Sequence, residues 1–201
     1  MIADILVLFS SLIIKIISAG DYFSVIVLMA LESACIPIPS EIIMPFSGYL
    51  ALIGQFNLWM IAFCATIGNL IGSLVAYFVG FYEGRPLLEK YGKYLFINHR
   101  DVKKADQLFE KHGFVAVFFG RLLPIVRTFI SLPAGIARMD LRKFILYTFI
   151  GSFPWNFGLA YLGFRLGEEW NVLEPYFHKF DILIGLIIGL FIIWWIHRHF
   201  K

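Results

Sequence analysis

Two arginines and two prolines lie within one apolar segment of this chain. Pro124 separates Arg121 from Arg127, and Pro133 follows among leucine, isoleucine, valine and phenylalanine. A guanidinium keeps its proton wherever it is placed, and at the centre of a membrane helix each one costs about 2.5–3.5 kcal/mol. Arginine's planar fork pairs with two phosphate oxygens at once. The segment therefore predicts a cationic site that holds a phosphate at membrane depth.

Glu32 and Glu41 lie in a second apolar segment and form the acidic half of the predicted site. Left unpaired, these acids and the two arginines would cost about 10–14 kcal/mol to insert, which is comparable to the stability of a whole domain. All four must therefore meet one another, water or a ligand. A carboxylate can gain a proton when its surroundings dry out or its partner leaves. We interpret Arg121 and Arg127 as phosphate-binding residues, and Glu32 and Glu41 as proton-coupling or gating residues.

An alternative role stays open for the same four residues, namely two buried Glu–Arg pairs that only lock two segments together. Buried ion pairs are often no more stabilising than apolar packing, which favours the functional interpretation. Several polar residues are candidates either for auxiliary contacts in the site or for bonds within the protein: Ser33, Ser40, Asn69, Thr128, Ser131 and Asn156. Trp155 is interpreted as a packing or interfacial aromatic residue.

The composition is that of an integral membrane protein. Of the 201 residues, 60% are hydrophobic and 15% are charged, and the mean hydropathy is +0.80. Soluble domains are about 45–50% apolar and about 25% charged. The length suits a single membrane domain over residues 1–201. The small net charge of +3 and the sequence, which has no basic run with interleaved aromatics, argue against a nucleic-acid partner.

The sequence predicts no metal site, no cofactor and no enzyme. Cys35 and Cys64 lie in apolar sequence and are expected to pack as small hydrophobic residues. All five histidines are expected in loops or at helix ends: His99, His112, His178, His197 and His199. An intramembrane lipid phosphatase would need a nucleophile with a base beside it, and this pattern does not supply the pair.

Clustered prolines predict two re-entrant hairpins, at residues 22–54 and 114–139. A proline removes a backbone donor and obstructs the preceding helical turn. Irregular backbone in a membrane must be covered by protein or line a wet cavity. The tip of the first hairpin is expected near residues 36–40, and Pro45 counts as a further breaker. The turns are shaped by Pro37, Pro39, Pro124, Pro133 and Gly135.

The other apolar segments predict helices, so the fold class is all-α. Membrane-spanning helices are expected at residues 59–81 and 144–164, at about 20 residues per span. A polar loop at 165–179 leads into a last helix at 175–199. Residues 1–18 form either a short span or an interfacial helix, and the sequence does not decide between them.

The distribution of charge predicts the orientation. Residues 82–112 contain seven lysines and arginines and an amphipathic helix at 98–112 that is expected to stop at Gly113. Positive loops stay in the cytoplasm, which places this connection and the C-terminus there and residues 165–179 outside. The first hairpin then enters from the outside and the second from the cytoplasm. Because the two approach from opposite faces, a glutamate of one can face an arginine of the other.

The two halves of the chain resemble each other. The first span ends in Ala76-Tyr77-Phe78-Val79-Gly80-Phe81 and the second in Ala160-Tyr161-Leu162-Gly163-Phe164. A proline-broken hairpin precedes each span, so residues 22–81 and 113–164 are predicted to be repeats, and the orientation makes them inverted. Inverted repeats with discontinuous helices are typical of transporters, whose site lies near the midplane where the repeats meet.

At these residues the chain resembles the DedA family, also called the VTT or SNARE-associated-Golgi-like membrane proteins. The resemblance covers residues 22–167. The matching motifs are Leu31-Glu32, Pro37-Ile38-Pro39-Ser40-Glu41, Gly48-Tyr49-Leu50-Ala51, Phe118 with Phe119-Gly120-Arg121, Pro124, Arg127, Pro133-Ala134-Gly135, Gly151 and Trp155. Some members have aspartate in place of Glu41, which keeps the charge and changes the geometry.

The resemblance implies two inverted re-entrant hairpins in a prokaryotic plasma membrane, lipid translocation, and essential acids and arginines. Members are associated with recycling undecaprenyl phosphate and with moving phosphatidylethanolamine, driven by a proton or sodium gradient, and eukaryotic relatives are phospholipid scramblases. We expect a transporter of undecaprenyl phosphate. A phospholipid translocase or scramblase and a cation/proton antiporter are the alternatives. The lipid, the coupling ion, the direction of transport and a homo-oligomeric state stay open.

Overall fold

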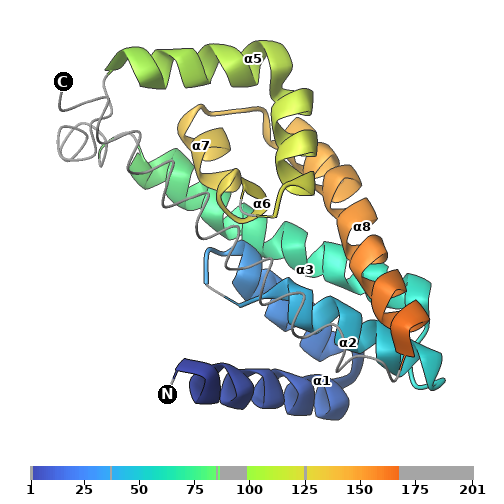
Figure 1. The fold of residues 1–201 in the computed structure, drawn as a ribbon. Helices are drawn as coiled ribbons and strands as arrows, with labels where there is room; N and C mark the ends of the chain where they lie inside the picture. The colour runs from blue at the N-terminus through green and yellow to red at the C-terminus, as the bar shows by residue number, and fades with distance from the viewer. Residues whose placement is uncertain (1, 37, 85, 87–98, 125, 168–201) are drawn as a thin grey trace. The chain divides into compact units, whose positions relative to one another are not determined.

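A computed structural model describes residues 2–36, 38–84, 86, 99–124 and 126–167, and these residues form helices joined by turns, with no strand among them (Figure 1). The chain divides into two compact units, Met1–Arg165 and Leu166–Lys201. The second unit, which includes the predicted helix at 175–199, lies almost wholly outside the described residues. So does most of the polar loop predicted at 165–179.

The first helix, α1 (Ile2–Ser33), consists of two helices joined at Asp21, whose φ of 51° and ψ of −149° are not helical. The sequence predicted a break here from Ala19-Gly20-Asp21. Residues Leu12–Ser33 are long and apolar enough to cross a membrane, with a mean hydropathy of 1.9. This candidate span begins at Leu12, inside the predicted 1–18 segment. Whether the turns of α1 before Leu12 belong to a span or lie at the membrane interface stays open.

The first hairpin breaks where the proline cluster predicted a tip. Residue Ser33 ends α1, and α2 (Ser40–Leu52) begins directly after Pro39. Pro45 was counted as a breaker, but it lies inside α2. A side chain added at Gly163 of α8 would meet the Pro45 carbonyl, so α8 packs directly on this turn. Close helix packing therefore outweighs the local penalty of the proline.

The first predicted span is confirmed as α3 (Leu58–Val79), which continues into a wider turn, η1 (Gly80–Gly84). Asn57 caps its start, because the side-chain oxygen accepts hydrogen bonds from the backbone N–H of Trp59 at 3.0 Å and of Met60 at 3.2 Å. Residues Leu58–Gly84 are the second candidate membrane span, with a mean hydropathy of 1.8.

The amphipathic helix and the first arm of the second hairpin form one element, α5 (His99–Leu122), with a non-helical bend at His112 (φ −129°, ψ 28°). The predicted stop at Gly113 is therefore a bend, after which the helix continues to the proline break. Two short helices follow, α6 (Val126–Phe129) and α7 (Ser131–Ile136). Pro124 lies in the break, whereas Pro133 lies inside α7.

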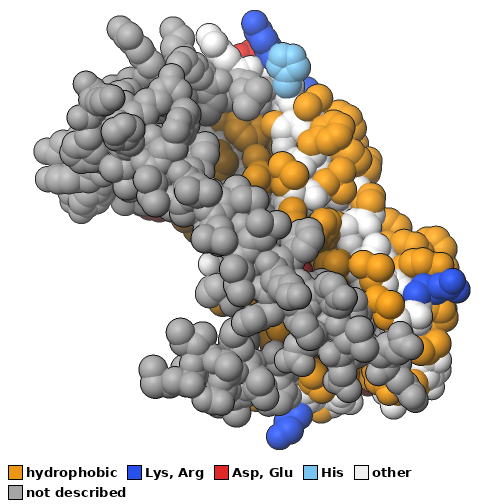
Figure 2. All heavy atoms as spheres, in the orientation of Figure 1, with side chains coloured by type: hydrophobic (Ala, Val, Ile, Leu, Met, Phe, Trp, Pro, Cys, Tyr) orange, Lys and Arg blue, Asp and Glu red, His pale blue; other side chains and the backbone are white. Residues whose placement is uncertain are grey.

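The second predicted span forms the continuous helix α8 (Leu141–Leu166), which contains Pro154. It is not among the two helices that qualify as candidate spans in the described part of the chain. Phenylalanine, tryptophan and aliphatic side chains are widely exposed on the described helices, including Phe23, Trp59, Val75, Phe119 and Leu146. Figure 2 shows hydrophobic side chains covering most of the described surface in view, with charged ones mainly at its margins.

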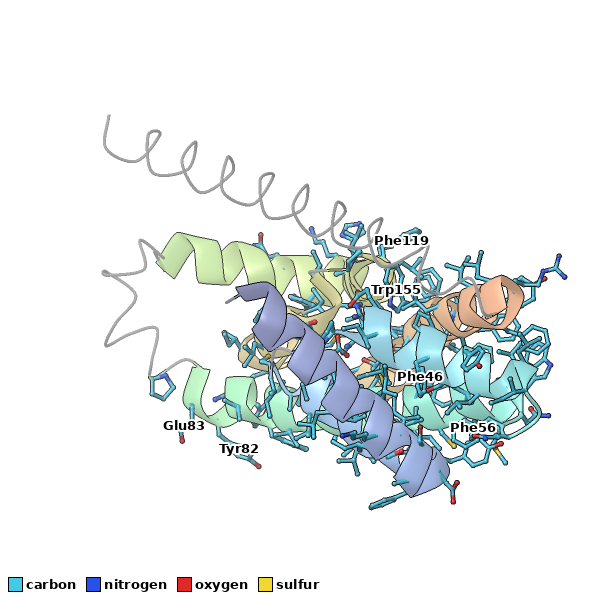
Figure 3. All side chains as sticks on the ribbon, turned by 60° about the horizontal axis from the view of Figure 1, so that its bottom comes forward. Phe46, Phe56, Tyr82, Glu83, Phe119 and Trp155 are labelled. Carbon is cyan, nitrogen blue, oxygen red and sulfur yellow. The ribbon has the colours of Figure 1, made fainter. Side chains whose placement is uncertain are left out.

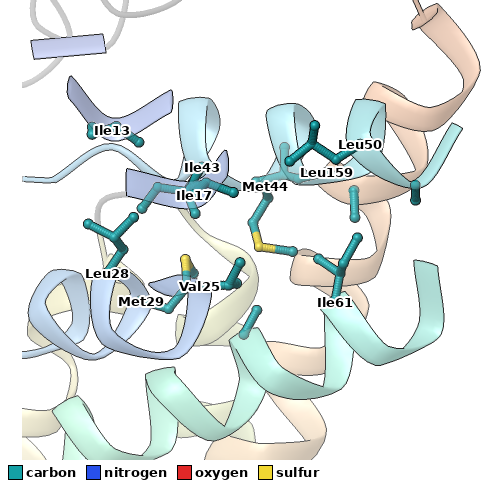
Figure 4. Packing of buried hydrophobic residues seen from close by; sticks show 13 residues of the cluster. Ile13, Ile17, Val25, Leu28, Met29, Ile43, Met44, Leu50, Ile61 and Leu159 are labelled. Carbon is teal, nitrogen blue, oxygen red and sulfur yellow. The ribbon is translucent and has the colours of Figure 1, made fainter. Parts of the chain in front are cut away.

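The core forms where the first hairpin meets both long helices. Met29 of α1, Met44 of α2, Ile61 of α3 and Leu159 of α8 belong to one buried cluster (Figure 4). A second cluster joins α3, α5, α7 and α8 around Tyr77 and Phe144. These two clusters fix the broken segments against α3 and α8.

Two pairs of helices pack equally closely. Helix α2 packs on α8, and α7 packs on the end of α3, in each case so closely that a side chain on a glycine would meet a backbone carbonyl. The glycine and carbonyl partners are Gly48 with Ala160, Gly163 with Pro45, Gly135 with Tyr77, and Gly80 with Leu132. Helix α2 therefore packs on the long helix of the second half of the chain, and α7 packs on the long helix of the first half.

Candidate functional site

Arg127 lies between the two predicted acids. Its Nη2 is 2.9 Å from Oε1 of Glu32 and 3.3 Å from Oε1 of Glu41. Arg127 is 5% exposed and Glu32 is 3% exposed, whereas the Glu41 side chain is 27% exposed. The arginine comes from α6 and the acids from the end of α1 and the start of α2. The two proline-broken turns therefore meet at a buried ion group.

Predicted auxiliary residues contact this ion group. Arg127 Nη2 donates a hydrogen bond to the hydroxyl of Ser40, and the hydroxyl of Thr128 donates to Oε1 of Glu32 at 3.3 Å. The Cys35 thiol lies 3.5 Å from the backbone carbonyl of Thr128, so the turns also touch through the backbone. Both cysteines are free thiols, and Cys35 packs at this junction.

Arg121 has different partners. Its Nη1 donates to the backbone carbonyl of Arg127 at 2.7 Å, and its Nη2 donates to the hydroxyl of Ser131 at 2.8 Å and lies 3.5 Å from that of Thr148. The side chain is only 2% exposed, and no carboxylate of the described residues lies within 4.0 Å of it. The sequence assigned the same role to both arginines, but the structure gives only Arg127 direct acidic partners.

Both arginines donate hydrogen bonds to carbonyls of the broken backbone. A helix end leaves carbonyls without intrahelical partners, and such groups cannot stay bare in a membrane. Arg127 Nε donates to the carbonyl of Pro124 at 3.2 Å, and Arg121 takes the carbonyl of Arg127. Each guanidinium therefore satisfies a carbonyl of the irregular segment, and Pro124 prevents that segment from continuing as one helix.

A chain of buried side-chain hydrogen bonds leads away from Glu32. Ser33 Oγ lies 3.4 Å from Glu32 Oε2 and 3.2 Å from Asn69 Oδ1. Asn69 then donates to Asn156 at 3.3 Å, and Asn156 donates to Thr66 at 3.2 Å. The two asparagines, which the sequence left open between site and helix packing, join α3 to α8. They are also connected through Ser33 to the site.

Of the residues predicted to shape the hairpins, Pro39 and Pro124 lie at the turns, whereas Pro133 and Gly135 lie inside α7. Pro39 precedes α2, Pro124 occupies the second break, and Gly135 packs on the Tyr77 carbonyl. Pro37 is outside the described residues. Where the chain is described, no group of three or more histidine, cysteine or acidic side chains is placed to hold a metal.

Trp155 is a site residue that sequence reasoning missed. The Arg127 guanidinium carbon lies 5.1 Å from the centre of its ring, a distance typical of a cation–π contact. The sequence predicts a packing or interfacial role for Trp155 and none for Thr148. The available signal was their place in α8 within two turns of Asn156. Spacing alone does not tell which of several tryptophans meets a buried arginine.

A family model for the VTT domain matches residues 38–165. Uncharacterized membrane protein YkoX of Bacillus subtilis is 39% identical over 87% of this chain and 77% of its own length. Undecaprenyl phosphate transporter A of Bacillus subtilis is 38% identical over 78% of this chain and 81% of its own. A Lactococcus lactis protein named alkaline phosphatase-like is 34% identical over 90% of this chain and 87% of its own. No solved structure matches the chain.

The matches confirm the resemblance that the acid, proline and arginine motifs indicated. The matched region contains Glu41 and Arg127 of the ion group, the second broken turn, the helix α3 and nearly all of α8, whereas Glu32 and most of the first turn precede it. It covers more than half of the chain, and the relatives include bacterial membrane proteins. The chain belongs to the VTT-domain family of membrane proteins, also called the DedA family.

Proposed function

We propose that this protein transports a phosphate-bearing lipid, undecaprenyl phosphate, across the plasma membrane of a bacterium. The observation that carries the proposal is the buried Arg127, which two acids from the other hairpin hold in place. A guanidinium at membrane depth can bind a phosphate headgroup in two-oxygen geometry. The likeness to a protein named undecaprenyl phosphate transporter A supports this lipid as the substrate.

The proposed architecture is two re-entrant hairpins, related as an inverted repeat. The matched contacts of α2 on α8 and of α7 on α3 support this relationship, because each pairs a glycine of one half with a backbone carbonyl of the other. Inverted repeats place a binding site at the midplane where discontinuous helices meet. In this arrangement the 82–112 connection and the C-terminus face the cytoplasm.

The ion group suggests how a proton controls the site. With both acids ionised, Arg127 is shared by two carboxylates, which also repel an incoming phosphate. Protonation of Glu32 or Glu41 weakens one ion pair and removes one repelling charge, so that Arg127 becomes available to the phosphate. Release of the proton returns the arginine to the acids and expels the lipid. We propose proton coupling on this basis, with sodium as the alternative ion.

The decisive test is transport by the purified protein in liposomes. Undecaprenyl phosphate and phosphatidylethanolamine are compared under an imposed pH gradient, a sodium gradient, and neither. The proposal expects undecaprenyl phosphate transport that responds to the pH gradient. Equal movement of both lipids without a gradient would instead indicate a scramblase, and ion flux without any lipid phosphate would indicate an antiporter. Phosphate release into solution would identify a lipid phosphatase.

A further inference from the structure

Four buried polar atoms beside the ion group have no hydrogen-bond partner within the described part of the protein. They are Arg121 Nε, Arg127 Nη1, Ser152 Oγ and Trp155 Nε1. The residues Arg121, Arg127 and Ser152 are each at most 5% exposed. A buried donor without a hydrogen-bond partner costs about 1–3 kcal/mol of stability. Four such donors in one region are therefore unusual.

The four atoms belong to one place in the fold. Arg127 stacks on the Trp155 ring at 5.1 Å, and Gly151 of α8 packs so closely on Arg121 that an added Cβ would lie 3.0 Å from the Cβ of Arg121. Ser152 and Trp155 are three residues apart on α8 and so share one helix face. Figure 3 shows Trp155 in the middle region of the described helices, between the ends marked by Tyr82 and Phe56.

All four atoms can donate a hydrogen bond. The guanidinium and indole nitrogens can only donate hydrogen bonds, and the serine hydroxyl also has a proton to donate. The acidic partners lie on another part of Arg127, because both bond to Nη2 and leave Nη1 free. A cation cannot use such a set. A group with several acceptor oxygens and negative charge complements it best.

We propose that Ser152 and Trp155 complete, with Arg121 and Arg127, a donor cage for a terminal phosphate, so that α8 is part of the binding site. This inference rests on the proposed function and specifies its substrate class as a phosphate monoester. A monoester offers three free oxygens to donors from several sides. A phosphodiester headgroup offers two and carries a second ester arm into the space that the cage occupies.

The sharpest variant is Trp155→Phe, which removes the indole N–H and keeps an aromatic ring under Arg127. Ser152→Ala removes the other α8 donor. Each should weaken binding of a soluble phosphate monoester, farnesyl phosphate, by about tenfold, because hydrogen bonds to charged groups are among the stronger ones. Binding is measured in detergent by titration calorimetry, with the diester phosphatidylglycerol as the comparison ligand, which wild type should bind at least tenfold more weakly.

Matched controls and a stability readout separate binding from packing. Trp59→Phe changes an exposed tryptophan of α3, and Ser47→Ala changes a buried serine whose hydroxyl donates to the Ile43 carbonyl of its own helix. Both variants should bind farnesyl phosphate as wild type does. Because these donors of Ser152 and Trp155 have no partner among the residues that the structure describes, their variants should keep or raise the melting temperature without ligand.

The outcomes distinguish the cage from the transport proposal. Unchanged monoester affinity in Trp155→Phe and Ser152→Ala would overturn the cage, as would equal affinity for the diester or a fall in melting temperature matching the loss of binding. Undecaprenyl phosphate transport by wild type would stand in each of these cases. Tight monoester binding that depends on the α8 donors, without any lipid transport, would support the cage and refute the transporter.

Discussion

Arg127 and Glu32 form an ion pair of 2.9 Å between two broken turns that are far apart in the sequence. Neither residue has solvent to stabilise it, since both are at most 5% exposed. A buried charge that loses its partner costs several kcal/mol, so this pair connects the two turns and also limits when Arg127 can serve a ligand. In the proposed mechanism, a phosphate would replace Glu32 as the partner of Arg127, and a proton would replace Arg127 as the partner of Glu32.

The two arginines should respond differently to substitution by lysine. Arg127→Lys keeps the charge and loses the planar fork, so lipid phosphate transport should fall at least tenfold. The melting temperature should fall less than in Arg121→Lys, because an ammonium can still pair with the acids and only the 3.2 Å bond to the Pro124 carbonyl is lost. The measurement is flux in liposomes at equal amounts of reconstituted protein. Arg142→Lys, at an exposed position near the start of α8, serves as the control. Retained transport in Arg127→Lys would show that the arginine serves only as a charge.

Arg121→Lys should instead destabilise the protein. Lysine cannot span from the carbonyl of Arg127 to the hydroxyl of Ser131, and losing such charged hydrogen bonds costs about 1.5–3 kcal/mol each. The expected result is a clear fall in melting temperature and in folded yield. A stable Arg121→Lys protein would show that the broken segment does not depend on this guanidinium.

The acids can be tested by fixing them in a neutral form. Glu32→Gln imitates the protonated carboxyl beside Arg127, Arg121, Glu41, Thr128 and Ser33. Phosphate binding should persist, while transport driven by a pH gradient should fall at least tenfold, because the residue can no longer exchange a proton. Binding and gradient-driven flux are measured on the same preparation.

The partly exposed acid supplies a graded comparison for that experiment. Glu41→Gln should reduce gradient-driven transport less than the buried Glu32 variant, since the Glu41 side chain is 27% exposed and its charge is better solvated. Glu83→Gln, in the exposed turn after α3, should have no effect. If Glu32→Gln abolished phosphate binding as well as coupling, the acids would be structural partners of Arg127.

Local signals in the sequence located the broken turns and their charges. A proline interrupts a helix within a few residues of its own position, and an ionisable residue in an apolar segment marks itself. The break after Ser33 and the break at Pro124 could therefore be predicted. The partners of each arginine could not, because a long side chain selects among neighbours that only tertiary packing supplies. Arg121 donates a hydrogen bond to a backbone carbonyl, and Arg127 forms ion pairs with both acids.

Long-range packing also explains the other differences between the sequence-based predictions and the structure. Pro45 remains in a helix although its type predicts a break, since α8 packs closely on that turn. The role of Trp155 depends on a ring contact with a residue of another segment. Such contacts leave no pattern in the sequence, whereas the echo of residues 76–81 by residues 160–164 can be read there.

The polar chain between α3 and α8 should act as one unit. Asn69→Ala leaves the side-chain oxygen of Asn156 without its donor, and Asn156→Ala leaves the side-chain nitrogen of Asn69 without its acceptor. Each should cost about 1–3 kcal/mol, and the double variant should cost clearly less than the two costs combined. Unfolding midpoints for both singles and the double complete the cycle. Pairing Asn69→Ala with a distant change, Asn57→Ala, should give additive costs.

The helix contacts predict which glycines are essential. Gly48→Ala and Gly135→Ala would place a methyl group against the backbone carbonyls of Ala160 and Tyr77, so one helix of each pair must move. Such overpacking costs about 1–3 kcal/mol, and the melting temperature of both variants should fall. Gly158→Ala is the control, because a Cβ there meets nothing within 4 Å and alanine favours a helix by about 1 kcal/mol. If the two packed variants differed sharply, with only one destabilised, the matched contacts would not be equivalent and the proposed inverted repeat would lose its main support.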